Sequence, residues 1–337
     1  MSGELFHPVD IGPVHIPGNL FLAPVAGYSD RAFRQVCRTG GADFAYTEMV
    51  SAEALVRGSA KTSALMQKAP NETQYAVQLF GGSPASMERA VSLVRERFFP
   101  DIIDINAGCP VPKIVKTGAG SALTRDPERL AAVVRAAVKA AGSVPVTVKI
   151  RSGWDAAHLS WKEAALAAAE AGAAAVTLHP RTRAQGYDGR ADWELLAELR
   201  ALLAKETDGA VPVFGSGDVF SPEAARDMLA QTGCAGVMFA RGALGNPFIF
   251  AQTKELLLHG SYADIPASRR IEAGLRELEL LCADKGEACA CREMRKRFCA
   301  YSKGLSGGAE LRARIAQVQT AAEYRTLFAP YTEPARS

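Results

Sequence analysis

Short apolar runs recur along the first three-quarters of the chain, and each is followed by a polar or glycine-rich segment. The runs are rich in β-branched residues and too short for helices. Most are apolar on both faces, which is typical of strands buried in a parallel sheet. The eight runs cover residues 20–26, 43–49, 75–81, 102–108, 145–151, 174–180, 211–217 and 236–242.

Helical segments lie between these runs. Residues 83–98 begin with Ser-Pro, and residues 126–142 have an Asp cap, Pro in the first turn and Gly at the end. These are typical helix start and stop signals, and residues 160–172 and 221–233 repeat them. Eight β units alternating with helices over roughly 230 residues predict an α/β fold, a TIM (β/α)8 barrel.

A doubly wound sheet is the alternative, and it would favour a G-x-G-x-x-G fingerprint early in the chain. No such fingerprint follows the first predicted strand. The similar "GAGSAL" at 118–123 follows a loop rather than a strand. We therefore do not interpret it as a nucleotide-binding motif.

The pattern changes after about residue 260. Residues 261–270 form a polar connection, and the chain beyond it lacks β-rich runs. Three segments there, residues 269–286, 291–305 and 308–320, have helical composition. The sequence thus predicts a small C-terminal α-helical bundle domain, residues 259–330, after a barrel domain of residues 1–258.

Composition narrows the classes of protein only a little. With 48% hydrophobic and 22% charged residues the chain is typical of a globular protein, and a net charge of +3 neither requires nor excludes a polyanionic partner. No apolar stretch reaches the ~20 residues that span a bilayer, and the first residues lack the pattern of a signal peptide. Seven cysteines without a regular framework favour reduced thiols. We expect a cytoplasmic protein with no membrane association.

In TIM barrels the functional groups lie at the carboxyl ends of the strands. Nearly every predicted strand here ends in polar or small residues, and folding alone does not explain them, because each unpaired buried polar group costs ~1–3 kcal/mol. We therefore predict a site on this rim. Its candidates, in chain order, are Pro24, Val25, Ala26, Gly27, Gln78, Asn106, Cys109, Lys149, Arg151, His179, Arg181, Arg183, Gly215, Ser216, Gly217, Asp218, Ala240, Arg241 and Gly242.

The seventh and eighth strand-to-helix loops indicate a phosphate. Both are glycine-rich and one carries Arg241, a combination that binds phosphate in many barrels. Lys149 in the barrel mouth would be costly without an anionic partner. A reduced flavin supplies such an anion, and Gln78 would bond its pyrimidine side. This pattern favours FMN over a sugar phosphate.

Cys109 has four interpretations from the residues alone. As a metal ligand it lacks a C-x-x-C or H-x-x-x-H companion, and as a nucleophile it would need a base such as His179 close by. As a proton donor it needs only an ordinary pKa near 8.5 and a carbon that gains charge. The fourth interpretation is simple packing. The tail cysteines also lack metal-site spacing, so we expect structural thiols and no metal at Cys282, Cys289, Cys291 and Cys299.

Seven motifs in the chain resemble those of the bacterial tRNA-dihydrouridine synthases, in particular the B type, in order and approximate spacing. The most specific is N-x-G-C-P…G-x-G-S-x-L, followed by H-x-R-T-R. The resemblance spans the barrel and extends more weakly into the tail. The motifs are "LAPVAGYSDRAFR", "VQLFGG", "DINAGCPVPKIVKTGAGSAL", "VKIRSGW", "HPRTRAQGYDGRADW", "GSGDV" and "ARGALGNP".

The resemblance implies roles for individual residues. Cys109 matches the proton donor of the family. FMN would be held by Pro24, Val25, Ala26, Gln78, Lys149, His179, Ser216, Gly217, Asp218, Ala240, Arg241 and Gly242. Asn106, Arg181 and Tyr187 match positions near the bound uracil, and Lys149 is also near it. Basic residues that would meet tRNA phosphates are Lys113, Lys116, Arg292, Arg295, Lys296 and Arg297.

The implied reaction has two halves: NADPH reduces FMN, and the reduced flavin then passes hydride to C6 of a uridine while Cys109 protonates C5. The target base would be flipped out of the tRNA. Two alternatives remain: an FMN-dependent dihydroorotate or dihydropyrimidine dehydrogenase acting on a free pyrimidine, and a tRNA-binding folding factor without chemistry. The basic tail disfavours the first and the intact site disfavours the second. We expect tRNA and not DNA as partner, and the sequence decides neither the uridine modified nor the oligomeric state, a monomer being compatible with it.

Overall fold

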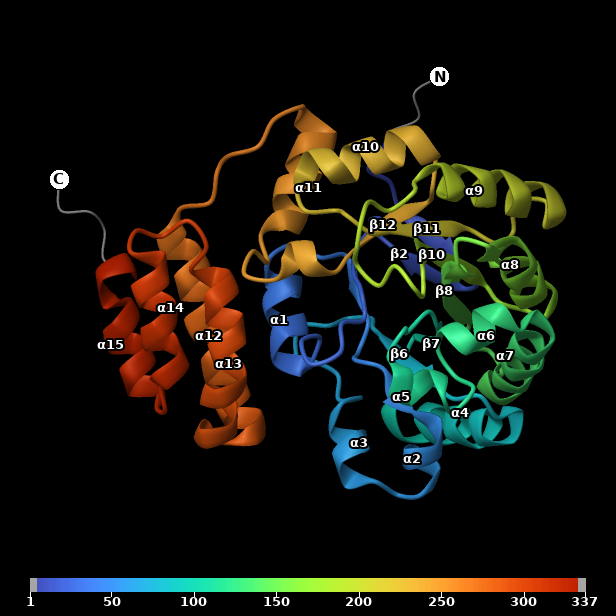
Figure 1. Cartoon of the computed structure of the whole chain (residues 1–337), viewed down its shortest axis with the longest axis horizontal. Coiled ribbons are helices and arrows are strands. Elements are labelled where there is room, and N and C mark those ends of the chain that lie inside the picture. Colours follow the sequence, from blue (N-terminus) through green and yellow to red (C-terminus); the bar gives the residue numbers. More distant parts are fainter. Residues whose placement is uncertain (1–4, 333–337) are drawn as a thin grey trace.

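The chain folds into a ring of parallel strands surrounded by helices, with a group of helices at its C-terminal end (Figure 1). This computed structural model describes residues 5–332. The strands of the ring are β3 (Leu20–Leu22), β4 (Phe44–Ala45), β5 (Val50–Ser51), β6 (Ala76–Phe80), β7 (Ile102–Ala107), β8 (Val146–Asp155), β10 (Ala175–Thr182), β11 (Val213–Ser216) and β12 (Gly236–Phe239).

Residues 44–51 close the ring. The first barrel strand, β3, pairs in parallel with the last, β12, and also with β4. A few residues later β5 pairs with β6, and Tyr46 forms a bridge to Ala76 between the two. Each of the eight predicted runs overlaps an observed strand, and β8 and β10 extend beyond the predicted ends. The predicted TIM (β/α)8 barrel is confirmed.

The barrel helices form the outer layer of this ring (Figure 1). Three of the predicted helices begin where the sequence indicated, because the side chains of Ser83, Asp126 and Ser221 accept hydrogen bonds from the backbone N–H three residues on. The helices are α1 (Arg31–Thr39), α2 (Ala52–Val56), α3 (Ala60–Ala64), α4 (Pro84–Phe98), α5 (Pro112–Val115), α6 (Ser121–Arg125), α7 (Pro127–Ala141), α8 (Trp161–Glu170), α9 (Glu194–Glu206), α10 (Pro222–Thr232), the 3-10 turn η1 (Arg241–Ala243) and α11 (Ile249–His259).

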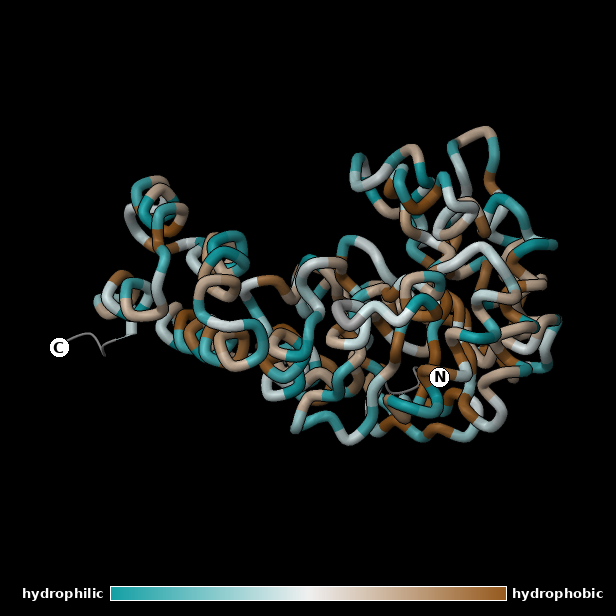
Figure 2. Tube along the Cα trace, turned by 90° about the horizontal axis from the view of Figure 1, so that it is seen from below, coloured by the Kyte–Doolittle hydropathy of each residue, from teal (hydrophilic) through white to brown (hydrophobic). Residues whose placement is uncertain are grey.

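Side-chain alternation along the strands positions the functional groups. On β7, Ile103 and Ile105 pack outward in the core between strands and helices, so Asp104 and Asn106 point into the barrel. The same alternation on β8 buries Val148 against the helices and turns Lys149 inward. The apolar residues concentrate in the strands and the inner faces of the helices (Figure 2). Polar inward positions therefore collect at the carboxyl end of the barrel.

A short hairpin that the sequence analysis did not assign covers the opposite end. Its strands, β1 (Val9–Ile11) and β2 (Val14–Ile16), pair antiparallel. Val9, Ile11 and Ile16 join a buried cluster inside the barrel. Gly12 at the hairpin tip approaches Pro145, which precedes β8. The N-terminal end of the barrel is thus filled and closed, leaving the carboxyl end for a site.

The C-terminal group contains four helices rather than the three predicted: α12 (Ala267–Lys285), α13 (Glu287–Tyr301), α14 (Gly308–Gln317) and α15 (Ala321–Thr332). The last of these, α15, was not predicted, and it contains Pro330 in its final turn. These helices share a core of their own around Leu278, Phe298 and Phe328. Our proposed division after residue 258 falls one residue before the end of α11.

A short strand, β9 (His158–Leu159), pairs antiparallel with the last residues of β8. No helix within the described part of the chain is both long and apolar enough to cross a bilayer.

Candidate active site

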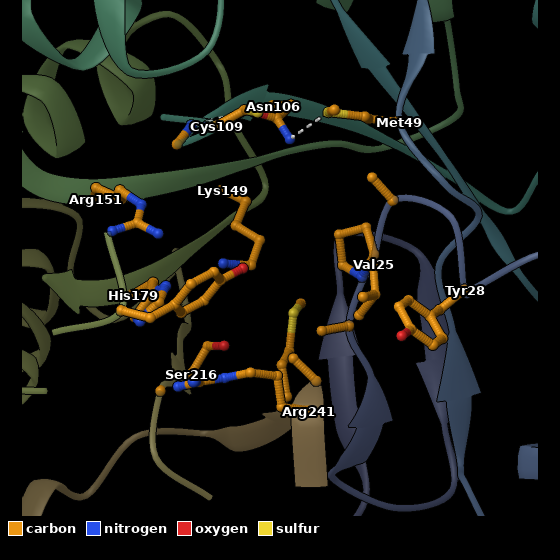
Figure 3. Close-up of a pocket in the computed structure, with 18 of the residues that line it drawn as sticks. Val25, Tyr28, Met49, Asn106, Cys109, Lys149, Arg151, His179, Ser216 and Arg241 are labelled. Atoms are coloured by element: carbon orange, nitrogen blue, oxygen red, sulfur yellow. Dashed lines mark hydrogen bonds between the residues drawn. The ribbon is translucent and has the colours of Figure 1, made fainter. Parts of the chain in front are cut away.

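The carboxyl ends of the strands surround a cavity of about 460 Å³ (Figure 3). This volume lies in the range of small-molecule and cofactor sites. All twelve residues predicted to hold a cofactor line it: Pro24, Val25, Ala26, Gln78, Lys149, His179, Ser216, Gly217, Asp218, Ala240, Arg241 and Gly242. The inward alternation of the strands is the reason that residues so distant in sequence converge here.

The residues predicted near the substrate base divide into two groups. Cys109, Asn106 and Tyr187 line the same cavity. Arg181 does not line it, because its side chain is buried behind the wall. There its Nη2 donates to Asp218 Oδ2 at 2.8 Å and to the carbonyl of Gly189 at 2.7 Å. In this structure Arg181 supports the wall instead of facing a ligand.

A buried chain of hydrogen bonds runs from the barrel interior to Cys109. Asp104 accepts from Thr147 Oγ1 through Oδ1 and from Gln78 Nε2 through Oδ2, both at 2.6 Å. Gln78 Oε1 in turn accepts from Asn106 Nδ2 at 2.9 Å. Asn106 Oδ1 accepts from the backbone N–H of Cys109 at 2.9 Å. These bonds connect neighbouring strands, since Gln78 pairs in register with Asp104.

The charge of Asp104 fixes the direction of this chain. An ionised carboxylate only accepts hydrogen bonds, so Gln78 must turn its NH2 group toward Asp104 and its oxygen toward Asn106. Asn106 must then present its oxygen to the N–H of Cys109. Burial raises the pKa of Asp104 to about 6, against hydrogen bonds from Thr147 and Gln78 that lower it. The carboxylate form therefore predominates at neutral pH.

The backbone around Cys109 is held on both sides of the residue. Its carbonyl accepts a 3.0 Å hydrogen bond from Ser121 N, and Ser121 Oγ donates to the carbonyl of Gly108 at 2.9 Å. Gly120 has a positive φ of 60° and passes so close that a Cβ would lie 2.6 Å from the Cys109 carbonyl oxygen. The glycines of the predicted motif thus allow the 109–120 loop to return against Cys109.

The thiol of Cys109 is partly exposed to the cavity and stays protonated at neutral pH. Burial raises the pKa of Cys109 above its usual value, although a backbone hydrogen bond at Val111 and the charge of Arg151 oppose this. A protonated thiol is suited to proton donation rather than to nucleophilic attack.

Positive charge dominates the middle of the cavity. Lys149 reaches from β8 toward its centre (Figure 3). Burial, together with the nearby charge of Arg151, lowers the pKa of Lys149 to about 8 even though Asp104 opposes the shift. Burial and the surrounding cations also hold the pKa of His179 well below its usual range. His179 is therefore neutral, and the cavity favours an anionic ligand.

The far end of the cavity is formed by the loops after β11 and β12. Gly217 has φ 110° and Asp218 φ 60°, so the backbone turns sharply where a phosphate was predicted. The Asp218 carboxylate accepts from Ala191 N at 2.7 Å, from Arg181 at 2.8 Å and from Arg241 at 3.4 Å. Its side chain therefore orients the two arginines, and a phosphate would meet the backbone of this loop and the Arg241 guanidinium.

Arg241 lies between two aromatic rings. Its Cζ is 4.3 Å from the ring centroid of Tyr187 and 5.0 Å from that of Phe220. Both rings are more than half exposed. Stacking of this kind holds a guanidinium in one place without neutralising it. The cation is thus kept at the cavity edge.

Sequence reasoning missed several residues of the site. Tyr28 and Met49 line the cavity, and Asp104 supports it from below. Met49 is the last residue of the second predicted strand, so the strand-end rule applied to the others would have found it. Asp104 carried a weaker signal, a carboxylate in an otherwise apolar strand, and its partner depends on the register of β6 against β7.

The basic residues predicted to meet RNA lie in different environments. Lys113 and Lys116 are exposed at α5, immediately after Cys109 in the chain. Arg292 is exposed on α13. Arg295 donates from Nε and Nη2 to the carbonyl of Val318 and is partly buried.

Two further residues of this set contact the barrel. Lys296 is exposed, and its Nζ donates to the carbonyl of Gly27 at 2.7 Å. Arg297 has a side chain only 2% exposed and forms ion pairs with Asp30 and Glu277. The prediction that Arg297 meets a tRNA phosphate is therefore corrected, because the structure commits this guanidinium to the interior.

A second basic feature lies on the rim, and of its three residues only Arg183 was among the predicted candidates. The guanidinium carbons of Arg125 and Arg183 lie 4.8 Å and 4.6 Å from the ring of Trp154, and we call these three residues the rim stack. Backbone hydrogen bonds hold Arg183 beside Trp154, since Arg183 N donates to Gly153 O at 2.8 Å and Ala184 N to Trp154 O at 2.9 Å. Arg125 is exposed and Arg183 partly so.

The cysteines are free thiols. Within residues 5–332 no group of three or more His, Cys, Asp or Glu side chains is arranged to hold a metal ion.

Comparison with known proteins gives a consistent result. Residues 21–333 match the sequence model of the family described as Dihydrouridine synthase (Dus). The chain is 53% identical over 328 residues to a probable tRNA-dihydrouridine synthase of Treponema pallidum, covering 96% of each chain. It is 37% identical over 312 residues to tRNA-dihydrouridine synthase B of Pseudomonas aeruginosa, covering 92% of each. A probable tRNA-dihydrouridine synthase of Mycobacterium tuberculosis is 37% identical over 92% of this chain and 81% of its own.

Proposed function

Since the chain belongs to the dihydrouridine synthase family, we propose that it reduces the C5=C6 bond of specific uridines in tRNA to 5,6-dihydrouridine. The observation that carries this proposal is the convergence of a protonated thiol, Cys109, with a buried cation, Lys149, and the Gln78–Asn106 amide pair in one cavity. In this arrangement the thiol can protonate one carbon of a pyrimidine, the cation can pair with an anionic cofactor and the amides can hydrogen-bond a ring.

The cavity fits FMN. Lys149, with Arg151 and Arg241 nearby, gives it an excess of positive charge, and the Gly217–Asp218 turn with Arg241 offers a phosphate subsite at one end. Lys149 and Gln78 would hold the ring and His179, neutral, would accept or donate one hydrogen bond. When bound and reduced, with NADPH as electron donor, the flavin supplies the hydride that uracil C6 takes up.

Cys109 completes the reduction with a proton. The thiol S–H bond breaks and its proton goes to uracil C5, so the base gains one hydride and one proton and the sulfur is left as a thiolate. The raised pKa of Cys109 keeps the thiol protonated before the step. The positive charge of Arg151, which opposes that rise, stabilises the thiolate after it. Solvent then restores the proton.

Asn106 and Tyr187 are proposed to position the base. The backbone N–H of Cys109 is held by Asn106, whose Nδ2 also lies 3.6 Å from Met49 Sδ (Figure 3). The Tyr187 ring is exposed above the cavity and stacks on Arg241. An exposed aromatic ring at the mouth offers a surface on which a flipped base can stack.

Basic surfaces beside the cavity support tRNA as the substrate. Lys113 and Lys116 lie on one side, and Arg292 belongs to the helical domain. The rim stack adds two guanidiniums whose positions are fixed by Trp154. Contacts to phosphates hold an RNA and add affinity without reading its sequence. A free pyrimidine would not need them.

The proposal is tested on the purified protein. It should be yellow and release FMN on denaturation. Under anaerobic conditions it should oxidise NADPH, and NADPH consumption should continue when unmodified tRNA is added. A colourless protein that cannot be reconstituted with FMN would contradict the proposal. Turnover with dihydroorotate or free uracil but not with tRNA would support the small-molecule alternative instead.

A further inference from the structure

The loop between β3 and α1 forms one wall of the cavity, and the helical domain holds it. Val25, Ala26 and Tyr28 of this loop line the cavity. Gly27 between them has a positive φ of 75°, a conformation that side chains resist. The loop therefore has a defined shape that depends on what holds Gly27.

Gly27 forms hydrogen bonds through both its backbone N–H and its backbone carbonyl. Its N–H donates to the Glu48 carboxylate, which lies in the segment that closes the barrel ring. Its carbonyl accepts from Lys296 Nζ at 2.7 Å and from Arg297 Nη2 at 3.3 Å, and both of these donors belong to α13 of the helical domain. A single residue of the cavity wall is thus held by the barrel on one side and by the helical domain on the other.

The second anchor is a buried network of charges. Arg297 Nη2 donates to Asp30 Oδ2 at 2.7 Å, and its Nη1 pairs with Glu277 of α12. Lys285 also donates to Asp30 at 2.9 Å. Asp30 is the N-cap of α1, where it accepts from Phe33 N at 3.1 Å. The network ties two helices of the helical domain to the residue at which the loop ends.

The helical domain also contacts the side chain of Tyr28. Lys296 Nζ lies 4.2 Å from its ring centroid, and Arg297 Cζ lies 5.6 Å from it. The tyrosine ring lines the cavity on its other side. The two cations therefore contact both the backbone and the aromatic side chain of the wall.

We propose that Lys296 and Arg297 make the helical domain a structural part of the cofactor site: they set the shape of residues 25–28 and so the strength with which the barrel holds its flavin, before any RNA is bound. This inference rests on the proposed function. It makes Lys296 a positioning residue for the cofactor wall, in addition to the RNA contact predicted from the sequence.

Lys296→Ala is the informative variant, because this side chain is exposed and its loss leaves no cavity in the core. Its control is Lys303→Ala, which removes an exposed lysine from the same domain. Flavin-free protein is titrated with FMN, without RNA or NADPH, and the dissociation constant is read from flavin fluorescence. We expect about tenfold weaker FMN binding for Lys296→Ala, near wild-type binding for Lys303→Ala, and partial recovery in Lys296→Arg.

A second variant acts on Gly27 through its backbone N–H instead of its carbonyl. Glu48→Gln weakens the bond to the Gly27 N–H from the barrel side and removes a charge that faces Lys285, Lys296 and Arg297, so it should also weaken FMN binding. Equal FMN affinity of wild type and Lys296→Ala would overturn the inference while leaving the proposed function in place. Wild-type protein that binds no FMN at all would overturn the proposed function and this inference together.

Discussion

Gln78 Nε2 lies 2.6 Å from Asp104 Oδ2, a hydrogen bond buried at the floor of the cavity. Neither side chain touches Cys109, yet both determine how the Cys109 backbone is held, because Asn106 connects Gln78 to it. The Asp104 carboxylate, which does not line the cavity, thus influences how the backbone of Cys109 is held.

Asp104→Leu should reduce turnover on tRNA by about 10- to 100-fold, because Gln78 loses the acceptor that fixes its orientation and two buried donors, Gln78 Nε2 and Thr147 Oγ1, lose their acceptor. Asp104→Asn keeps an acceptor and should retain more activity than Asp104→Leu. The measurement is single-turnover dihydrouridine formation at saturating FMN. Equal activity of the two variants would show that the acceptor at position 104 is unimportant.

The same carboxylate should make the protein less stable as pH rises. The pKa of Asp104 is about 6 in the folded chain and near 3.9 when unfolded, so between pH 4 and 6 the folded state binds more protons and the free energy of unfolding falls with increasing pH. Relative to Asp104→Asn, the wild type should lose about 1–3 kcal/mol between pH 4 and 7. Urea unfolding of both proteins at the two pH values measures this. A constant difference would contradict it.

Lys149 should make flavin binding depend on pH. Its pKa of about 8 means that the ammonium charge is present below that pH and lost above it. FMN binding by the wild type should therefore weaken as pH rises from 7 to 9, whereas Lys149→Met should bind at least about tenfold more weakly at pH 7 and show a flatter profile. Fluorescence titration across this range tests the prediction, and parallel profiles for the two proteins would refute it.

The rim stack should contribute to RNA binding. Replacing Arg125 and Arg183 together by Ala removes two cations, so tRNA should bind more weakly and the slope of log K against log salt should fall by ~1–2. FMN content should not change. The matched control replaces Arg135 and Arg200, which are exposed on the outer helices α7 and α9. If both double variants show the wild-type slope, the rim stack does not contact RNA.

Much of the fold could be predicted because its signals are local. The apolar runs from residue 20 to 242 alternate with capped helices, and each run overlaps a strand. The hairpin at Val9–Ile11 and Val14–Ile16 was not predicted, since each strand has only three residues and gains its stability from burial under the barrel. The helix at Ala321–Thr332 was also not predicted, and its buried residues Tyr324, Leu327 and Phe328 pack against the other helices of this domain.

In the site, too, residues with a local sequence signal could be predicted, whereas residues whose role depends on tertiary packing could not. Lys149 and His179 could be found because they lie near the ends of predicted apolar runs, and Arg241 because it follows the last strand, β12. The role of Asp104 could not, because it depends on which residue of β6 lies beside it. Arg297 looked like the other basic residues of its helix. Only the packing of that helix against Asp30 and Glu277 reveals that it is buried.

Mass spectrometry of tRNA nucleosides tests the central claim most directly. Unmodified tRNA is incubated with the FMN-loaded protein and NADPH, and uridines are examined for the addition of two hydrogens. We expect dihydrouridine with the wild type and a loss of about 100-fold or more with Cys109→Ala, whose flavin is still reduced by NADPH. Absence of dihydrouridine with the wild type, or its undiminished formation by Cys109→Ala, would contradict the account.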